Sequence, residues 1–254
     1  MAPPAERALL EAAVEIARAA GDLTLRWFRS SALAVDHKGD GSPVTEADRA
    51  AERLVRDELM RRYPADAVVG EEEADTPGTS GRRWMVDPID GTKAFMRGVP
   101  LYSTLLALDD EHGPAVGVIH LPALGETVHA GRGLGCFCND VPAHVSREAS
   151  LARACLTTCG FDDWPAAMFA AAHGSGAALR TWGDGYGYAL VATGRVEAMI
   201  DPVIAPHDVA PMPVIMREAG GRYSDLRGSD SITSGDAIAS NGLVHDELLA
   251  LLAS

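Results

Sequence analysis

The chain has 254 residues, of which 47% are hydrophobic and 23% charged, and its formal net charge is −14. This length suits one sizeable core or two closely packed halves, and the composition is typical of a globular protein. The acidic balance, without a block of Lys and Arg, argues against a nucleic-acid-binding protein, because clustered basic side chains hold phosphate backbones. No apolar run is long enough for a membrane span and no signal peptide is visible, so we expect no membrane partner and a cytoplasmic location.

Two helices are predicted near the start of the chain. Apolar residues recur every three or four positions from residue 5 to residue 29, which is typical of an amphipathic helix whose apolar stripe faces the core. A second helix is predicted from Thr45 to Tyr63. Thr45-x-x-Asp48 is the pattern of a capping box at its start, and Pro64 follows its last residue.

Short apolar segments, separated by Gly and Pro, predict the strands of the first half. They lie at residues 67–69, 84–86, 101–108, 116–121 and 127–130. The last three are expected to be consecutive antiparallel strands of one sheet. Pro88 and Gly91 are expected to end the 84–86 strand before Thr92 begins a helix.

Strand and helix patterns alternate in the second half of the chain. The strands are predicted at residues 155–158, 179–182 and 196–200, and the helices at residues 165–173, 185–193 and 209–219. Pro211 and Pro213 fit poorly into the last of these helices. Its first turn is therefore expected to be irregular, or the helix to begin later.

The most informative segment is residues 84–92, Trp-Met-Val-Asp-Pro-Ile-Asp-Gly-Thr. It places Asp87 and Asp90 three residues apart at the end of an apolar strand. Buried carboxylates without partners are very costly, so a hard cation such as Mg²⁺ is the expected neutralising partner. The backbone N–H groups of Gly91 and Thr92 would favour a phosphate at the start of the next helix. The alternative interpretation is a pair of turns that merely caps a helix.

Two further acidic positions extend this pattern. Glu71 follows the predicted strand at residues 67–69 and can supply a third carboxylate, although an acidic triplet is also typical of a solvated loop. Asp208 precedes the helix predicted at residues 209–219, where it is either another ligand or an N-cap. The four cysteines lack the spacing of zinc sites and are interpreted as reduced structural thiols.

Together, these segments resemble the inositol monophosphatase superfamily of Mg²⁺-dependent, lithium-sensitive phosphomonoesterases. The resemblance covers nearly the whole chain and rests on the motifs at residues 42–48, 70–72, 87–92, 191–195, 207–210 and 218–221. Residues 91–100 and 180–186 look most like the histidinol-phosphate phosphatase branch. That branch implies the hydrolysis of histidinol phosphate to histidinol in histidine biosynthesis.

The resemblance also implies a fold, a metal set and an assembly. The fold would be a mixed α/β, five-layered α-β-α-β-α sandwich, with an N-terminal half at residues 1–145 and a C-terminal half at residues 146–254, and the protein would be a homodimer. Two Mg²⁺ ions are implied, and a weaker third ion near Glu71 is left open. The implied ligands are Glu71, Asp87 and the Ile89 carbonyl for the first ion, and Asp87, Asp90 and Asp208 for the second.

The same resemblance assigns catalytic roles. The hydroxyl of Thr92 would orient the attacking water, Asp48 would accept a hydrogen bond from Thr92, and Glu71 would help to take up the proton. Gly91 and Thr92 would bind the phosphate. Lys38 would reach over the site from its glycine-containing loop, although a loop lysine is more often just solvated.

Four residues are candidates for binding the alcohol half of the substrate. Asp201 lies seven residues before Asp208, where inositol phosphatases carry an acidic residue that binds substrate hydroxyls. Asp184 replaces a small polar residue of those enzymes, Arg180 belongs to the same motif, and His207 stands where the family usually has Trp. Two carboxylates suit a cationic alcohol such as histidinol, with its ammonium and imidazole groups. The alternative is that either aspartate only caps a helix or turn.

Other functions stay open at this point. Inositol phosphates, sugar phosphates and nucleotide monophosphates are alternative small phosphorylated substrates. A phosphate-binding regulatory protein with a decayed site is disfavoured, because every implied metal ligand and Thr92 are present. A structural metal protein is disfavoured too, since a Mg²⁺ site made of carboxylates is normally left open and hydrated.

Overall fold

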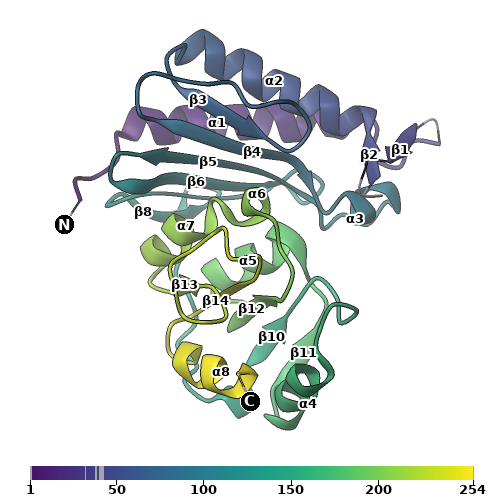
Figure 1. Ribbon diagram of the computed structural model, residues 1–254, viewed down its shortest axis with the longest axis vertical. Coiled ribbons are helices and arrows are strands. Elements are labelled where there is room, and N and C mark those ends of the chain that lie inside the picture. Colours follow the sequence, from purple (N-terminus) through teal and green to yellow (C-terminus); the bar gives the residue numbers. More distant parts are fainter. Residues whose placement is uncertain (1, 32, 38, 40–42, 254) are drawn as a thin grey trace.

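The structure, a computed structural model, describes residues 2–31, 33–37, 39 and 43–253. Lys38 lies outside the described residues, so its role stays a prediction. The described elements form five layers, with helices outside and between two sheets (Figure 1). This arrangement confirms the predicted mixed α/β sandwich.

The first layer consists of α1 (Arg7–Thr24) and α2 (Glu46–Arg62), which pack on one face of the larger sheet. The predicted capping box is confirmed, because Thr45 caps α2 and its backbone N–H donates to Asp48. The first helix is shorter than predicted. Its end coincides with a hydrogen bond from the Thr24 hydroxyl to the Gly21 carbonyl, after which the chain turns. The short strands β1 (Val35–His37) and β2 (Pro43–Thr45) pair before α2 begins.

The second layer is a seven-stranded sheet. In spatial order it contains β3 (Ala67–Gly70), β4 (Arg83–Asp90), β5 (Ser103–Asp110), β6 (Gly113–Leu121), β7 (Glu126–Gly131), β8 (Gly135–Cys138) and β9 (Val141–Pro142). Strands β3 and β4 are parallel, and β5, β6 and β7 confirm the predicted antiparallel succession. Strands β8 and β9 were not predicted, because they are short and rich in Gly, Cys and Pro.

One prediction about this sheet is wrong. Strand β4 does not end before Pro88 but continues through it to Asp90, and α3 (Thr92–Met96) follows. The pairing register with β5 shifts between Asp87 and Asp90, which leaves Pro88 at an irregularity where its missing N–H breaks no ladder hydrogen bond. The Pro88 carbonyl accepts a hydrogen bond from the Thr104 hydroxyl at 2.8 Å.

The remaining layers come from the second half of the chain. The central helices are α5 (Asp184–Ala192), α6 (Pro206–Val209) and α7 (Met212–Ala219). The smaller sheet contains, in spatial order, β11 (Ala178–Arg180), β10 (Cys155–Thr157), β12 (Ala198–Asp201), β14 (Ala237–Ser240) and β13 (Arg222–Ser224). A 3₁₀ turn (Leu151–Arg153) precedes it, and α4 (Ala166–Gly174) and α8 (His245–Leu252) form the outer layer.

The helix predicted at residues 209–219 is divided in two. Pro211 stands immediately before α7, and Pro213 occupies its first turn, where a missing N–H costs nothing. The prediction of a later helix start is confirmed. The sequence did not indicate the short α6, although its position decides where Asp208 lies.

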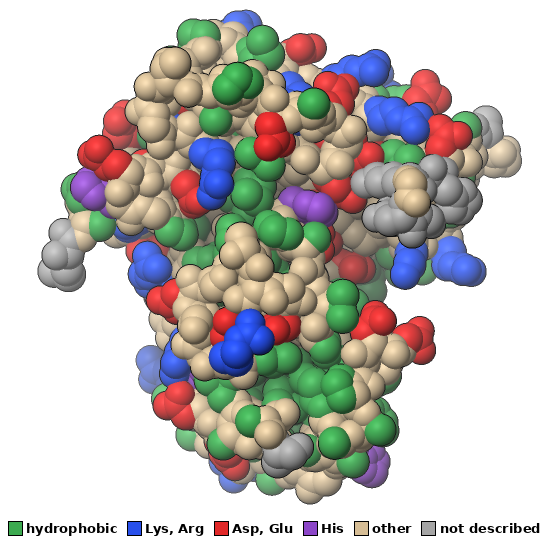
Figure 2. Space-filling model, viewed as in Figure 1, with side chains coloured by type: hydrophobic (Ala, Val, Ile, Leu, Met, Phe, Trp, Pro, Cys, Tyr) green, Lys and Arg blue, Asp and Glu red, His purple; other side chains and the backbone are tan. Residues whose placement is uncertain are grey.

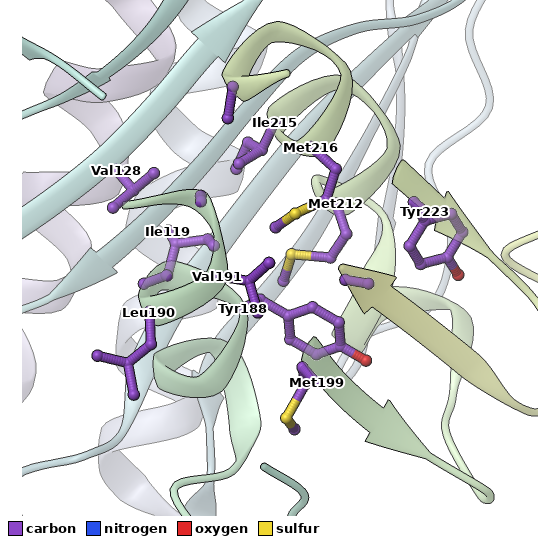
Figure 3. Packing of buried hydrophobic residues seen from close by; sticks show 14 of the residues in the cluster. Ile119, Val128, Tyr188, Leu190, Val191, Met199, Met212, Ile215, Met216 and Tyr223 are labelled. Atoms are coloured by element: carbon purple, nitrogen blue, oxygen red, sulfur yellow. The ribbon is translucent and has the colours of Figure 1, made fainter. Parts of the chain in front are cut away.

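One apolar cluster joins the two sheets through the central helices. Tyr188 and Val191 of α5 and Met212 of α7 pack between Ile119 of the larger sheet and Met199 of the smaller one (Figure 3). The predicted boundary at residues 145 and 146 falls between β9 and β10, and the division into halves stays a prediction. Because both sheets share this cluster, it holds them in place relative to each other. In the part of the chain that the structure describes, no helix is long and apolar enough to cross a membrane.

Candidate active site

Four carboxylates from separate segments converge at one end of β4. Asp87 and Asp90 come from β4, Glu71 follows the parallel strand β3, and Asp208 comes from α6. Oxygen atoms of Asp87, Asp90 and Asp208 lie within 4.8 Å of one another. Ligand atoms of Glu71, Asp87 and His207 form a second group within the same distance limit. The structure therefore brings together all four predicted carboxylate ligands.

These residues line a cavity of about 560 Å³ between the two sheets. Figure 2 shows acidic side chains and a histidine at the waist between the upper and lower parts of the molecule. Ile89, the predicted carbonyl ligand, and Gly91 and Thr92, the predicted phosphate-binding residues, also line this cavity. The walls thus come from both halves of the chain.

Gly91 shapes the corner between β4 and α3. Its φ is +86°, a left-handed conformation that favours glycine. A Cβ atom added there would lie 2.8 Å from Asp184 Oδ2, so the neighbouring side chain also requires a glycine. This close approach places the start of α3 against the start of α5.

The carboxylates repel one another because they are buried together. Burial raises the pKa of Asp87 well above its usual value, and the charges of Glu71, Asp90 and Asp208 add to that shift. Burial also raises the pKa of Asp90, and the charges of Asp184 and Asp208 raise it further. A divalent cation relieves this repulsion, and oxygen atoms are the donors that Mg²⁺ prefers. The donor set therefore fits such an ion.

Asp90 is held from both halves of the molecule. Its Oδ2 accepts hydrogen bonds from Ser103 Oγ at 2.6 Å and from the backbone N–H of Gly185 at 2.5 Å. Gly185 leaves no room for a side chain, since an added Cβ would lie 2.3 Å from Ser103 Oγ. The orientation of Asp90 thus depends on β5 and α5 together.

The expected hydrogen bond between Thr92 and Asp48 is not formed in this structure. The Thr92 hydroxyl donates instead to the Ile89 carbonyl at 3.1 Å. Oδ2 of Asp48 accepts from the backbone N–H and the hydroxyl of Thr45, because Asp48 completes the capping box. Its other oxygen, Oδ1, is buried and has no hydrogen-bond partner among the described residues. Burial raises the pKa of Asp48.

The four residues predicted to bind the substrate lie in different surroundings in the structure. Asp184 lines the cavity, and its φ of +55° is a strained conformation for a residue other than glycine. His207 lies beside the carboxylates, with Nε2 3.4 Å from Asp208 Oδ1 and 3.8 Å from Glu71 Oε1. Asp201 is 2% exposed, and Arg180 is exposed and stacks on Trp182. Neither belongs to the described lining of the cavity.

Cys159 links Asp201 to Asp184 by hydrogen bonds. The Tyr188 hydroxyl donates to Asp201 Oδ2 at 2.8 Å, and the backbone N–H of Cys159 donates to Oδ1 at 3.4 Å. The thiol of Cys159 accepts from the Asp184 N–H at 3.1 Å and donates to Asp184 Oδ1 at 3.5 Å. Burial raises the pKa of this thiol, as do the charges of Asp201 and Asp184, so it stays protonated and able to donate.

Several charged or polar residues of the cavity were missed by sequence reasoning. Lys93 and Arg97 of the α3 segment line it, as do Cys159, Asp162 and Asp163 from the loop after β10. Lys93 and Arg97 lie within the motif at residues 91–100, which is the signal that could have found them. Cys159, Asp162 and Asp163 carry no motif, and the fold brings their loop to the site.

Comparisons with known proteins agree with this geometry. A sequence model described as "Inositol monophosphatase family" matches residues 5–254. The chain is 41% identical to a histidinol-phosphatase of Chlorobaculum parvum, with 96% of each chain covered. It is 40% identical to a histidinol-phosphatase of Mycobacterium tuberculosis, covering 94% of this chain and 96% of the other. An IMPase structure from Thermotoga maritima superposes with a TM-score of 0.88 at 33% identity, covering 97% of each chain. The chain therefore belongs to the inositol monophosphatase family.

Proposed function

We propose that this phosphomonoesterase hydrolyses histidinol phosphate to histidinol with the help of Mg²⁺. The observation that carries the proposal is the convergence of Asp87, Asp90 and Asp208 within 4.8 Å, with Glu71 beside them. Relatives named histidinol-phosphatase that align over nearly the whole chain support the choice of substrate. Histidine biosynthesis is the pathway that this substrate implies.

The metal ligands are those that the resemblance implies, and the donor set fits them. We expect Glu71, Asp87 and the Ile89 carbonyl to hold a first ion, and Asp87, Asp90 and Asp208 to hold a second, with Asp87 shared. When bound, such ions would neutralise phosphoryl charge and lower the pKa of a water molecule. A third ion near Glu71, and inhibition by lithium, stay predictions from the resemblance.

The protein's own groups would orient the phosphate and the water. Lys93 and Arg97 place positive charge beside Gly91 and Thr92, the predicted phosphate-binding residues. The unpartnered Oδ1 of Asp48 is a buried acceptor, and an unsatisfied buried acceptor costs about 1–3 kcal/mol. A hydrogen bond from Thr92 or from a water molecule would satisfy it, in keeping with the predicted role of Asp48.

Lining residues from the second half of the chain supply negative charge for the alcohol. They are Asp184, Asp162 and Asp163, and Cys159 lines the cavity with them. An ammonium or imidazolium group would form charge-assisted hydrogen bonds with such carboxylates, whereas a neutral inositol ring would not gain that energy. Asp201 would contribute indirectly, because it fixes Cys159, which in turn holds Asp184.

A panel of phosphate esters tests the proposal. Phosphate release would be measured with and without Mg²⁺ from histidinol phosphate, inositol 1-phosphate, fructose 1,6-bisphosphate and AMP. We expect Mg²⁺-dependent release with the highest kcat/KM for histidinol phosphate. A preference for inositol 1-phosphate would show that the proposed substrate is wrong, while the proposed metal chemistry would still hold. Absence of hydrolysis for every ester would instead favour a phosphate-binding regulatory protein.

Two further expectations concern the protein as a whole. A cytoplasmic location and a homodimer both stay predictions. Light scattering coupled to gel filtration measures the molar mass directly, and a mass near that of one 26.7 kDa chain would contradict the dimer.

A further inference from the structure

His207 places an imidazole nitrogen among the carboxylates. A ring nitrogen of His207 and oxygen atoms of Glu71 and Asp87 all lie within 4.8 Å of one another. The side chain of His207 is 25% exposed and that of Glu71 is 19% exposed, so both lie at the rim, while Asp87 is buried beneath them. This group shares Asp87 with the all-carboxylate group of the second ion.

The backbone of α6 fixes the direction of this imidazole. Pro206 begins the short helix, and Asp208 Oδ2 accepts a hydrogen bond from the backbone N–H of Ala205 at 2.9 Å. Oδ1 of Asp208 lies 3.4 Å from His207 Nε2. The carboxylate that caps α6 therefore also lies against the neighbouring imidazole, and both side chains face the metal site.

The distances suit a shared ion. Ligand atoms at about 2.0–2.2 Å from one metal lie about 3 Å apart when adjacent and about 4.3 Å apart when opposite. The 3.8 Å between His207 Nε2 and Glu71 Oε1 falls inside that interval. An ion between Glu71 and Asp87 would thus come within reach of a nitrogen ligand without a movement of the backbone.

We propose that His207 is a ligand of the first metal site, which makes that site a mixed nitrogen and oxygen site. This inference rests on the metal site of the proposed function. Imidazole suits transition metals such as Zn²⁺ and Fe²⁺, and Mn²⁺ accepts a nitrogen ligand more readily than the harder Mg²⁺, which prefers oxygen ligands. The protein therefore binds Mn²⁺ more tightly than an all-oxygen site would, and His207 sets the preference between Mn²⁺ and Mg²⁺.

The test uses Mn²⁺ as a spectroscopic probe of the 254-residue chain. Pulsed electron paramagnetic resonance detects couplings between bound Mn²⁺ and a directly coordinated ¹⁴N nucleus. We expect such couplings in the wild type and in the control variant His112→Gln, which changes an exposed histidine in the turn between β5 and β6. They should be absent in His207→Gln and in His207→Trp, since an indole nitrogen is not a ligand.

Metal affinity supplies a second readout that is independent of turnover. Isothermal titration should show the Kd for Mn²⁺ rising about tenfold in His207→Gln, while the Kd for Mg²⁺ changes by less than about threefold. Circular dichroism checks that both His207 variants are folded, and His207→Trp keeps a large side chain at the rim.

Three results would overturn the inference. Wild-type protein that binds Mn²⁺ without ¹⁴N couplings would show that His207 only forms part of the wall. Equal losses of Mn²⁺ and Mg²⁺ affinity in the His207 variants would remove its role in selectivity. Absence of Mn²⁺ binding would remove the metal site itself. Failure of the proposed function can be told apart from failure of this inference. If ¹⁴N couplings are seen but no phosphate is released, His207 is still a metal ligand and only the proposed activity is wrong.

Discussion

Asp90 illustrates how a single carboxylate is held for metal binding. Two donors, from Ser103 and Gly185, fix its orientation, while burial and the charges of Asp184 and Asp208 raise its pKa. The hydrogen bonds compensate only part of that cost. A group with a raised pKa in the folded state stabilises the fold below its unfolded pKa, and this stability is lost as the pH rises through the folded pKa. Without metal, ionisation of Asp90 is therefore unfavourable in the folded protein.

We expect Asp90→Asn to abolish turnover while leaving the fold intact. The change removes one charge from the second metal site and also relieves repulsion in the metal-free protein. Phosphate release should fall by about two orders of magnitude or more, and the metal-free Tm should not decrease. Asp57→Asn, on the exposed face of α2, is the matched control. Near-normal Mg²⁺-dependent hydrolysis by Asp90→Asn would show that the metal assignment is wrong.

Asp184 is expected to determine the preference for a cationic alcohol. Asp184→Asn should raise KM for histidinol phosphate at least about tenfold more than KM for glycerol 2-phosphate, because only the cationic ester loses a charge-assisted contact of about 1.5–3 kcal/mol. Steady-state kinetics with both esters measures this ratio. Asp201→Asn should change it less, because Asp201 is buried behind Cys159. Equal losses for both esters in Asp184→Asn would remove the histidinol assignment.

The raised pKa of Asp201 leads to a prediction about how stability depends on pH. Burial raises its pKa from 3.8 to about 6, although Tyr188 and Cys159 donate hydrogen bonds to it. Because the folded pKa is raised, the stability from protonated Asp201 is present below about pH 4 and is lost as the pH rises through about 6. The loss is up to about 3 kcal/mol. Asn cannot ionise, so the Tm of Asp201→Asn minus that of the wild type should increase from pH 4.5 to pH 7.5. A difference that does not vary with pH would contradict the raised pKa.

At the scale of elements, the corner between β4 and α3 shows what local sequence can and cannot reveal. The order of apolar strand, Asp87, Asp90 and a helix at Thr92 could be predicted, because polar residues and Gly91 interrupt an apolar run. The continuation of β4 through Pro88 could not, because it depends on a register shift against β5. The contact between Gly91 and Asp184 joins residues 93 positions apart, and no local pattern encodes it.

Gly91→Ala tests that contact, with Gly113→Ala as a matched control. Both glycines have φ near +90°, so both substitutions carry the same backbone strain of about 1–2 kcal/mol. A Cβ at Gly113 would meet no described atom within 4 Å, whereas one at Gly91 would meet Asp184. We expect both variants to lose Tm but only Gly91→Ala to lose hydrolysis, by about tenfold or more. Equal activities would show that the close approach of α3 and α5 is unimportant.

Other elements follow the same division between local and distant determinants. Helix α2 was predicted well, because Thr45 and Asp48 form its cap within one turn. Strands β13 and β14 were missed, because three or four residues of Arg-Tyr-Ser or Ala-Ile-Ala-Ser show no periodicity, and their pairing partners lie far along the chain. The short α6 was missed because four residues are too few to show a helical period.

At the scale of the whole molecule, the site lies between two sheets that share one apolar cluster. The metal set could be predicted because its motifs are local, but the wall formed by Cys159, Asp162 and Asp163 could not, because only the fold brings the loop after β10 to the cavity at the end of β4. Ligands from β4 and α6 belong to different halves of the chain, so a bound ion should tie the halves together.

Metal binding should therefore stabilise the folded protein. A ligand that binds only the folded state adds about 2.7 kcal/mol when its concentration is 100 times its Kd. Differential scanning calorimetry should show a higher Tm with Mg²⁺ than with EDTA in the wild type, and a much smaller increase in Asp208→Asn, which lacks the ligand from α6. An unchanged increase in that variant would show that the ion does not join the two halves.

The most direct measurement of the central claim is phosphate release from histidinol phosphate by EDTA-treated protein as Mg²⁺ is added back. The account predicts negligible release without metal, saturable recovery with Mg²⁺, and no comparable recovery in Asp208→Asn. Undiminished release after metal removal, or full recovery in Asp208→Asn, would contradict a metal-dependent phosphatase site built from both halves of the chain.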